Sequence, residues 1–484
     1  MKSIVGASIV SIITESLYDK PIVVFREYAQ NAVDSISHVG SGIDTDTLAV
    51  QIWYENNNLY FVDNGQGVDP QHFLSTMRSI ANSSKSKVES IGYKGIGRLS
   101  GISYCAKLSF INILDYSKNV FQRYDIDCEE YYSIRKRPDF NTLTFDDLMG
   151  MIGTEINITD YSSIRAIAEK YGTLFEERST GFIVILENIS PVLRTAIKQK
   201  SLTEELGWLL PVPFSDLLSR EEPFCSLSTS PVPTSNPSIP AKSYNIFLNG
   251  KRLERPLTSD MFRSYLCTSE LDQYGICLHA FSNHKLSIDK GNPFSGIRIY
   301  FNNMLLCDET ELVPALIQYG LTSHSLNELI QTVRSIGALI YITDKVSISE
   351  NARRTFIEVT DSDAIAFLRY ISEFVEKVYR TRYALSDYSS AKEKGEAESQ
   401  KLATYRERAI AALEDLASSH IELDDPPIES TDFNMLSLAE QKKIIRKEIS
   451  KAFSVSVKKY LSQINTFDLD TCFEDFITWL QANK

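Results

Sequence analysis

The stretch FREYAQNAVDSI, residues 25–36, places three polar side chains in a segment whose apolar residues recur at helical spacing. Pro21, just before it, suits a first helical position. Glu27, Asn31 and Asp34 stand at i, i+4 and i+7, so on a helix they share a narrow stripe. A solvated face is the plain alternative. The segments that follow favour a helix that presents a carboxylate, an amide and a second carboxylate to a ligand.

The first of these segments is FVDNGQGVD, residues 61–69, which is typical of an apolar strand followed by a glycine-containing turn. Asp63 at the strand end can accept a hydrogen bond from the exocyclic amine of adenine, a donor that guanine lacks at that position. Gly65 and Gly67 have no Cβ, so we expect their backbone to approach a flat ring closely. This segment therefore predicts an adenine site.

The second segment is IGYKGIGRLSG, residues 91–101. Gly92, Gly95 and Gly97 can present successive backbone N–H groups to phosphate oxygens, next to the N-terminus of a helix expected to begin near Arg98. Lys94 is a candidate for an additional charge on the phosphates. Each glycine cluster alone is weak evidence for a nucleotide site, but the two clusters in this order predict an ATP site.

The polar stripe of residues 25–36 would then face the nucleotide, with Asp34 among the binding residues. Asn31 offers an oxygen to Mg²⁺, a hard cation that prefers oxygen ligands. Glu27, one turn earlier, is placed to orient and deprotonate the attacking water. Arg26 is also included among the candidate catalytic residues. The cofactors expected are ATP and Mg²⁺.

These residues resemble the GHKL ATPase superfamily, in which an acidic-amide-acidic helix, an Asp-x-Gly-x-Gly strand end and a Gly-rich lid form the Bergerat ATP site. Residues 11–36, together with RSIANSSKS at residues 78–86, are similar to the first helices and the lid of the ninety-kilodalton heat-shock chaperones. The resemblance implies an N-terminal α/β sandwich, a closing lid over residues 68–101, and a homodimer that forms when ATP binds.

Later segments extend the resemblance. GIRIYFNNMLLCDETELVPALIQ, residues 296–318, and VSISENARRTF, residues 346–356, are similar to the chaperone middle domain, which implies that Arg353 reaches the γ-phosphate, with Arg354 as its rival. Thr154 matches the late Gly-Thr of the family, whose hydroxyl helps to hold the adenine region. YFNNMLL is also similar to MORC-type ATPases, so the branch within the superfamily stays open.

The predicted fold class is α/β throughout, with a helical C-terminal region. We expect a GHKL ATP-binding domain at residues 1–212, a linker rich in Ser and Pro at 213–242, a transducer-like middle domain at 243–385 and helices at 386–484. In this division the strand pattern YNIFLNGK, residues 244–251, opens the second domain.

Composition sets outer limits on function. The 484 residues are 43% hydrophobic and 23% charged, which is ordinary for a chain with more than one cored domain. Seven cysteines without a C-x-x-C pair favour a reducing, cytoplasmic setting over a disulfide framework or a zinc cluster. The net charge of −13 gives no general attraction to nucleic acid, and no apolar run reaches membrane-spanning length.

Two functions remain open at this point. One is a chaperone-like ATPase that clamps as a dimer on an unknown protein client. The other is a MORC-like or MutL-like DNA clamp, or a defence-system effector, that grips phosphates through a basic run containing Lys442, Lys443, Arg446 and Lys447. A solvated face of an amphipathic helix is the favoured explanation of that basic run. A sensor that binds ATP without hydrolysing it is disfavoured by Glu27, because binding needs no general base.

Overall fold

The computed structural model describes residues 5–14, 20–39, 47–80, 96–171, 174–175, 178–214, 243–256, 264–271, 276–282, 295–301, 303–342, 362–393 and 400–417. They fold into two compact units. The first comprises the described residues up to Pro256 and residues 303–305. The second comprises the remainder.

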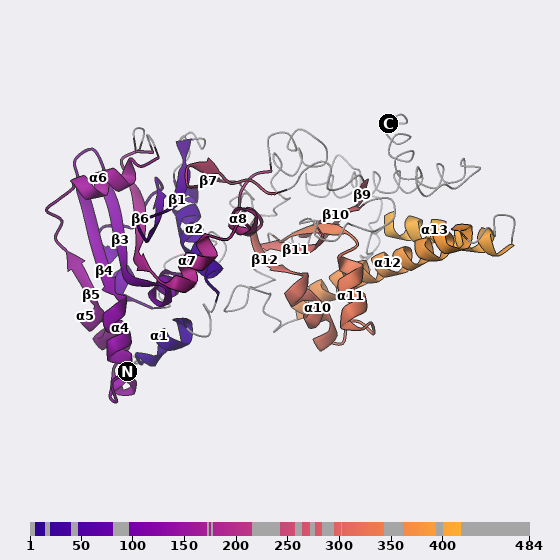
Figure 1. Ribbon diagram of the computed structural model, residues 1–484, viewed down its shortest axis with the longest axis horizontal. Helices are drawn as coiled ribbons and strands as arrows, with labels where there is room; N and C mark the ends of the chain where they lie inside the picture. Colours follow the sequence, from indigo (N-terminus) through magenta and orange to yellow (C-terminus); the bar gives the residue numbers. More distant parts are fainter. Residues whose placement is uncertain are drawn as a thin grey trace, which may run out of the picture. The chain divides into compact units, whose positions relative to one another are not determined.

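The first unit is built on an eight-stranded mixed sheet in the order β5-β4-β3-β6-β2-β1-β7-β8 (Figure 1). Neighbouring strands are antiparallel except for β1 and β7, which are parallel. The strands are β1 (Ala49–Glu55), β2 (Asn58–Asp63), β3 (Cys105–Asp115), β4 (Val120–Asp127), β5 (Gly153–Ile156), β6 (Gly181–Ile189), β7 (Asn245–Leu248) and β8 (Lys251–Arg252).

The helices of this unit are short except for α2. The helices of the unit are α1 (Ser8–Ile12), α2 (Ile22–Ser37), α3 (Phe73–Arg78), η3 (Gly97–Tyr104), α4 (Cys128–Arg135), η4 (Phe140–Thr142), α5 (Phe145–Ile152), α6 (Ser162–Ala168), α7 (Pro191–Ile197) and α8 (Leu202–Leu209). The α/β fold class is therefore confirmed, and the helix expected near Arg98 is present as the 3₁₀ helix η3.

Alternation along the strands divides the sheet into two faces. On one face, Leu108 and Phe110 of β3 belong to the main core, which also contains Phe25 and Val33 of α2. On the other face, Ile111 of β3 belongs to a smaller core that includes residues of α6. The sheet thus carries α2 on its larger core, which fixes the side of the molecule where the polar stripe lies.

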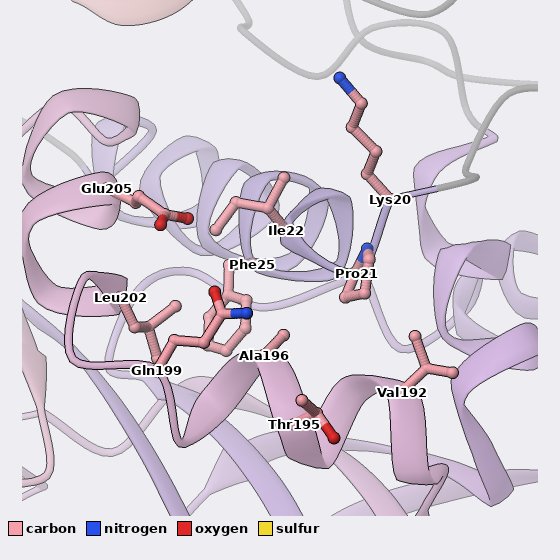
Figure 2. Close-up of a pocket in the computed structure, with 10 residues that line it drawn as sticks. All are labelled: Lys20, Pro21, Ile22, Phe25, Val192, Thr195, Ala196, Gln199, Leu202 and Glu205. Atoms are coloured by element: carbon pink, nitrogen blue, oxygen red, sulfur yellow. The ribbon is translucent and has the colours of Figure 1, made fainter.

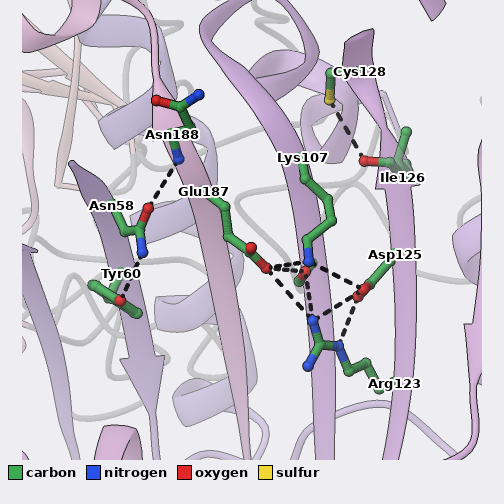
Figure 3. A network of polar contacts seen from close by, with 10 residues as sticks. Asn58, Tyr60, Lys107, Arg123, Asp125, Ile126, Cys128, Glu187 and Asn188 are labelled. Atoms are coloured by element: carbon green, nitrogen blue, oxygen red, sulfur yellow. Dashed lines mark hydrogen bonds and ion pairs between the residues drawn. The ribbon is translucent and has the colours of Figure 1, made fainter. Parts of the chain in front are cut away.

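Beside the smaller core, the second face carries a charged network (Figure 3). Lys107 Nζ lies 2.7 Å from Glu187 Oε1, and Arg123 Nε donates to Asp125 Oδ1 at 2.8 Å. Lys107 on β3 pairs across strands with Glu187 on β6, whereas Arg123 and Asp125 are neighbours on the same face of β4. The two cations are therefore balanced by two carboxylates on this sheet face. Since the cluster is internally neutralised and lies across the sheet from α2, we regard it as structural.

One expectation about domain organisation is wrong. The strand near residues 244–251 does not open the second unit, because β7 pairs in parallel with β1 from Ala49↔Asn245 to Ile52↔Leu248. Ile246 is fully buried in the main core of the first unit. Pairing with β7 satisfies the backbone groups of β1 that would otherwise form an open edge, and it buries apolar surface at the same time.

The second unit has a five-stranded sheet in the order β12-β11-β13-β10-β9 (Figure 1). Along the chain, α10 and α11 connect β12 to β13, and two long helices follow β13. Its elements are β9 (Ser264–Leu271), β10 (Ile276–Ser282), β11 (Gly296–Phe301), β12 (Met304–Asp308), α10 (Glu309–Gln318), α11 (Leu326–Val333), β13 (Gly337–Ile342), α12 (Ser362–Glu393) and α13 (Gln400–Ala417). The helical character expected of the C-terminal region is present in α12 and α13, the last described elements.

None of the helices in the described part of the chain has the length and apolar character of a membrane span. Within the same residues, no group of three or more His, Cys, Asp or Glu side chains is arranged to hold a metal ion.

Candidate nucleotide-binding site

The polar stripe of α2 is not a solvated face. Glu27 and Asp34 are each only 1% exposed, although both carry a carboxyl group. Asn31 is half-buried, one helical turn after Glu27. Burying carboxylates costs free energy unless partners compensate, so a helix that buries two of them needs a specific environment on that side.

Asp63, the last residue of β2, lies beside the C-terminal part of α2. Its Oδ1 accepts hydrogen bonds from Ser35 Oγ at 2.8 Å and from the backbone N–H of Gly65 at 2.9 Å. Ser35 was not identified from the sequence, although it continues the spacing of Glu27 and Asn31 to i+8. The stripe that meets the strand end is therefore Glu27, Asn31 and Ser35.

The turn after Asp63 shows why its glycines are required, and the reason differs from the expected one. A Cβ on Gly65 would lie 2.7 Å from the backbone nitrogen of Ile36, so this glycine lets the turn pack against α2. Gly67 adopts φ +71°, and a Cβ there would lie 2.7 Å from Asn112 Oδ1. Both glycines meet protein atoms where we expected an approach to the base.

The structure does not bring Thr154 to this site. Thr154 is exposed on β5, and β4, β3 and β6 separate β5 from β2, which at about 4.8 Å per strand is roughly 19 Å across the sheet. Thr180, just before β6, instead donates from its Oγ1 to the carbonyl of Gly65 at 2.9 Å. Thr180 was not identified from the sequence, although it stands directly before Gly181, the first residue of β6.

At the other end of the stripe, Glu27 faces the first residue of η3. A Cβ on Gly97 would collide with the Glu27 carboxylate, so glycine allows the backbone to pass directly over that group. Tyr28 holds η3 in place, because its hydroxyl donates to the carbonyl of Arg98 and accepts from the N–H of Gly101, each at 2.9 Å. Burial raises the pKa of the Tyr28 phenol well above its ordinary value, so this hydroxyl stays protonated.

Two further predicted residues lie on other sides of α2. The Arg26 guanidinium donates to the carbonyl of Leu305, near the start of β12, a residue that belongs to the first unit. Asp34 lies near Tyr244, whose phenol pKa is raised by burial and, in addition, by the negative charge of Asp34. The roles predicted for Arg26 and Asp34 stay predictions.

Several predicted residues lie outside the described part of the chain. They are Gly92, Lys94 and Gly95 of the expected phosphate loop, Arg353 and Arg354 of the second domain, and the basic residues Lys442, Lys443, Arg446 and Lys447. Their roles stay predictions.

The geometry thus joins a buried carboxylate, an amide and a second, hydrogen-bonded carboxylate along one helix and one strand end. Residues 22–146 match the family model of histidine kinase-, DNA gyrase B- and HSP90-like ATPases. The match spans α2, the Asp63 turn and Gly97, and it supports a GHKL-type ATPase domain in this part of the chain. Since that family model covers kinases, gyrases and chaperones alike, the branch stays a prediction. No curated protein matches the chain.

A separate cavity of about 430 Å³ opens beside the first turn of α2 (Figure 2). Phe25 of α2, Val192 of α7 and Leu202 of α8 form part of its wall, and the charged side chains of Lys20 and Glu205 also border it. None of Glu27, Asn31, Ser35 or Asp63 lines this cavity. It is therefore distinct from the residues that match the ATP site.

Proposed function

We propose that this chain is a magnesium-dependent ATPase that binds adenine nucleotide along α2 and couples hydrolysis to a conformational cycle. The proposal rests on one observation above all: the buried stripe of α2 ends at the hydrogen-bonded Asp63 carboxylate on one side and at the Glu27–Gly97 contact on the other. The match of residues 22–146 to a family of ATPases supports the same function.

Each described residue has a chemical role in this proposal. Asp63 accepts a hydrogen bond from the exocyclic amine of the base, and Asn31 contributes an oxygen ligand to magnesium. A single amide oxygen suits Mg²⁺, which keeps several waters and phosphate oxygens as ligands and does not need a protein cage. When bound, the ion would neutralise phosphate charge. Glu27, which is buried, accepts the proton of the attacking water.

In its finer form, the proposal is a chaperone-like machine. The lid over residues 68–101 closes on bound nucleotide, Arg353 of the second domain engages the γ-phosphate, and two protomers clamp together until hydrolysis releases them. This part rests on the resemblance of the sequence to the heat-shock chaperones. The alternative is an ATP-gated DNA clamp that uses the basic run at Lys442–Lys443 and Arg446–Lys447.

The deciding experiment is magnesium-dependent ATP turnover, measured with and without duplex DNA, with Glu27→Ala as the blank. We expect the wild-type chain to hydrolyse ATP and Glu27→Ala to bind ATP but lose 100-fold or more of the turnover, since general-base catalysis contributes about 10²–10⁴-fold. Stimulation by DNA that is lost at higher salt would favour the clamp. Absence of both binding and turnover in the wild-type chain would refute the proposed function.

Asp63→Asn tests the base-recognition role separately. The substituted amide can turn a donor toward the adenine amine, so we expect nucleotide affinity to fall by about 100-fold, the scale of a lost hydrogen bond to a charged group. The measurement is calorimetric titration with ADP and Mg²⁺, which involves no hydrolysis. Wild-type affinity in Asp63→Asn would place the base elsewhere.

A further inference from the structure

The hydroxyl of Ser35 occupies a specific place between helix α2 and the turn after Asp63. Its oxygen accepts the backbone N–H of Gly67 at 3.1 Å, and its proton is donated to Asp63 Oδ1 at 2.8 Å. Because the Gly67 N–H takes up acceptor capacity on the hydroxyl oxygen, the hydroxyl proton is directed toward the carboxylate. Chains of this kind polarise one another, which strengthens each bond.

A second donor reaches the same carboxylate oxygen. The N–H of Gly65 donates to Asp63 Oδ1 at 2.9 Å, so two donors converge on one atom of a side chain that is only 4% exposed. A carboxylate whose Oδ1 is fixed in this way has its plane and the direction of its other oxygen fixed as well. Direction matters here because hydrogen bonds weaken steeply as they leave linearity.

The turn that follows Asp63 is held by further hydrogen bonds. Thr180 donates to the carbonyl of Gly65, and the N–H of Gln66 donates to the carbonyl of Ser35 at 2.9 Å. The position of the turn therefore does not depend on the Ser35 hydroxyl alone. Removal of that hydroxyl should loosen the Asp63 side chain more than it displaces the turn.

We propose that Ser35 is a positioning residue that aims the Asp63 carboxylate, so that the preference of the site for a 6-aminopurine depends on the Ser35 hydroxyl. This inference rests on the proposed function, and it adds a specificity determinant to the same site. Ser35 acts through Asp63 and does not itself read the base.

The test compares two ligands that differ only in the group Asp63 would read. ADP carries the exocyclic amine, and purine riboside 5′-diphosphate has hydrogen in its place; both are titrated with Mg²⁺ into the full chain by calorimetry. In the wild-type chain we expect ADP to bind at least 10-fold more tightly. In Ser35→Ala we expect ADP affinity to fall about 5- to 10-fold, because Ser35 acts on the base only through Asp63 and the loss is on the scale of an ordinary net hydrogen bond. Analogue affinity should change less than about twofold.

Ser37→Ala is the matched control. Ser37 is also a hydroxyl of α2, but it donates to the backbone carbonyl of Asp34 and is exposed, so its loss should affect neither ligand. Alanine is a strong helix former, and retained analogue binding would show that the Ser35→Ala site is folded.

The outcomes separate the two proposals. If Ser35→Ala lowered the affinities for ADP and for the analogue equally, Ser35 would only shape the turn. If the ADP affinity did not change, the orientation of the Asp63 carboxylate would not depend on Ser35. Either result would overturn the inference. Failure of the wild-type chain to bind ADP would instead overturn the proposed function.

Discussion

The two ends of the α2 stripe are built by different means. At the Asp63 end, side-chain and backbone hydrogen bonds from Ser35, Gly65 and Thr180 hold a carboxylate and the turn that follows it. At the Glu27 end, the defining feature is steric: Gly97 has no side chain, and its backbone passes directly over the carboxylate. Hydrogen bonds fix the orientation of the Asp63 carboxylate. Close packing against Gly97 leaves no room for a side chain beside the Glu27 carboxylate.

This difference implies that recognition and hydrolysis can be altered separately. A change at the Asp63 end removes one of several hydrogen bonds, each of which contributes a modest free energy. A change at the Glu27 end displaces a group whose geometry must be held closely for catalysis, where small misplacements cost large factors in rate.

The largest effect is expected from Gly97→Ala. The new Cβ would collide with the Glu27 carboxylate, so we expect kcat to fall by about 100-fold or more, while the retained backbone N–H keeps ADP affinity within a few-fold of wild type. Steady-state turnover and calorimetry measure the two quantities. Gly150→Ala is the control, because a Cβ at Gly150 meets no atom within 4 Å. Normal turnover in Gly97→Ala would show that Glu27 does not need its present position.

A smaller effect is expected when the hydrogen bonds between the Tyr28 hydroxyl and η3 are removed. Tyr28→Phe leaves the Arg98 carbonyl and the Gly101 N–H without this partner, which should lower the free energy of unfolding of the first unit by about 1–3 kcal/mol. Chemical denaturation measures it, and Tyr161→Phe, at an exposed position, is the control.

The difference in the free energy of unfolding between the wild-type chain and Tyr28→Phe should depend on pH with a definite sign. Burial raises the Tyr28 pKa, so the folded state favours the protonated hydroxyl. Its contribution is complete below the pKa of an unfolded tyrosine, about 10, and is lost only as the pH rises through the higher folded value. The difference in the free energy of unfolding between the wild-type chain and Tyr28→Phe should therefore stay constant from pH 7 to pH 9. A difference that becomes smaller over this range would contradict the burial of the Tyr28 hydroxyl.

The smallest effect distinguishes the two threonines. Thr180→Val keeps the shape of the side chain but loses the bond to the Gly65 carbonyl, so we expect ADP affinity to fall about 2- to 10-fold. Thr154→Val, on the exposed edge strand β5, should leave affinity unchanged. The reverse pattern in calorimetric titration would restore the role that the sequence suggested for Thr154.

Local patterns were sufficient to predict the α2 helix, the strand that ends at Asp63 and the need for small residues at Gly65, Gly67 and Gly97. These features depend on residues close together in the sequence, where helical spacing and strand alternation carry the information. Ser35 could also have been found, since i, i+4 and i+8 extend one stripe, but a lone serine in a helix carries no distinct signal.

Long-range strand pairing explains why the sequence did not give the positions of Thr154 and of residues 244–251 in the fold. Thr154 and Thr180 both precede or begin strand-like runs, and the order of strands in the sheet decides which one lies near Asp63. Likewise, Ile246 lies beyond a Ser- and Pro-rich segment that resembles a domain boundary, yet β7 joins the first sheet. A parallel partner almost 200 residues away leaves no trace in a local pattern.

The pairing of β7 with β1 has a consequence for cleavage of the chain. The piece that follows residue 242 remains bound to the first unit through the Tyr244–Pro211 and Arg255–Pro213 backbone hydrogen bonds, in addition to the strand pairing. A single nick between residues 214 and 243 should therefore leave two fragments that co-purify. A fragment that ends at residue 214 would instead expose the β1 edge and invite self-association.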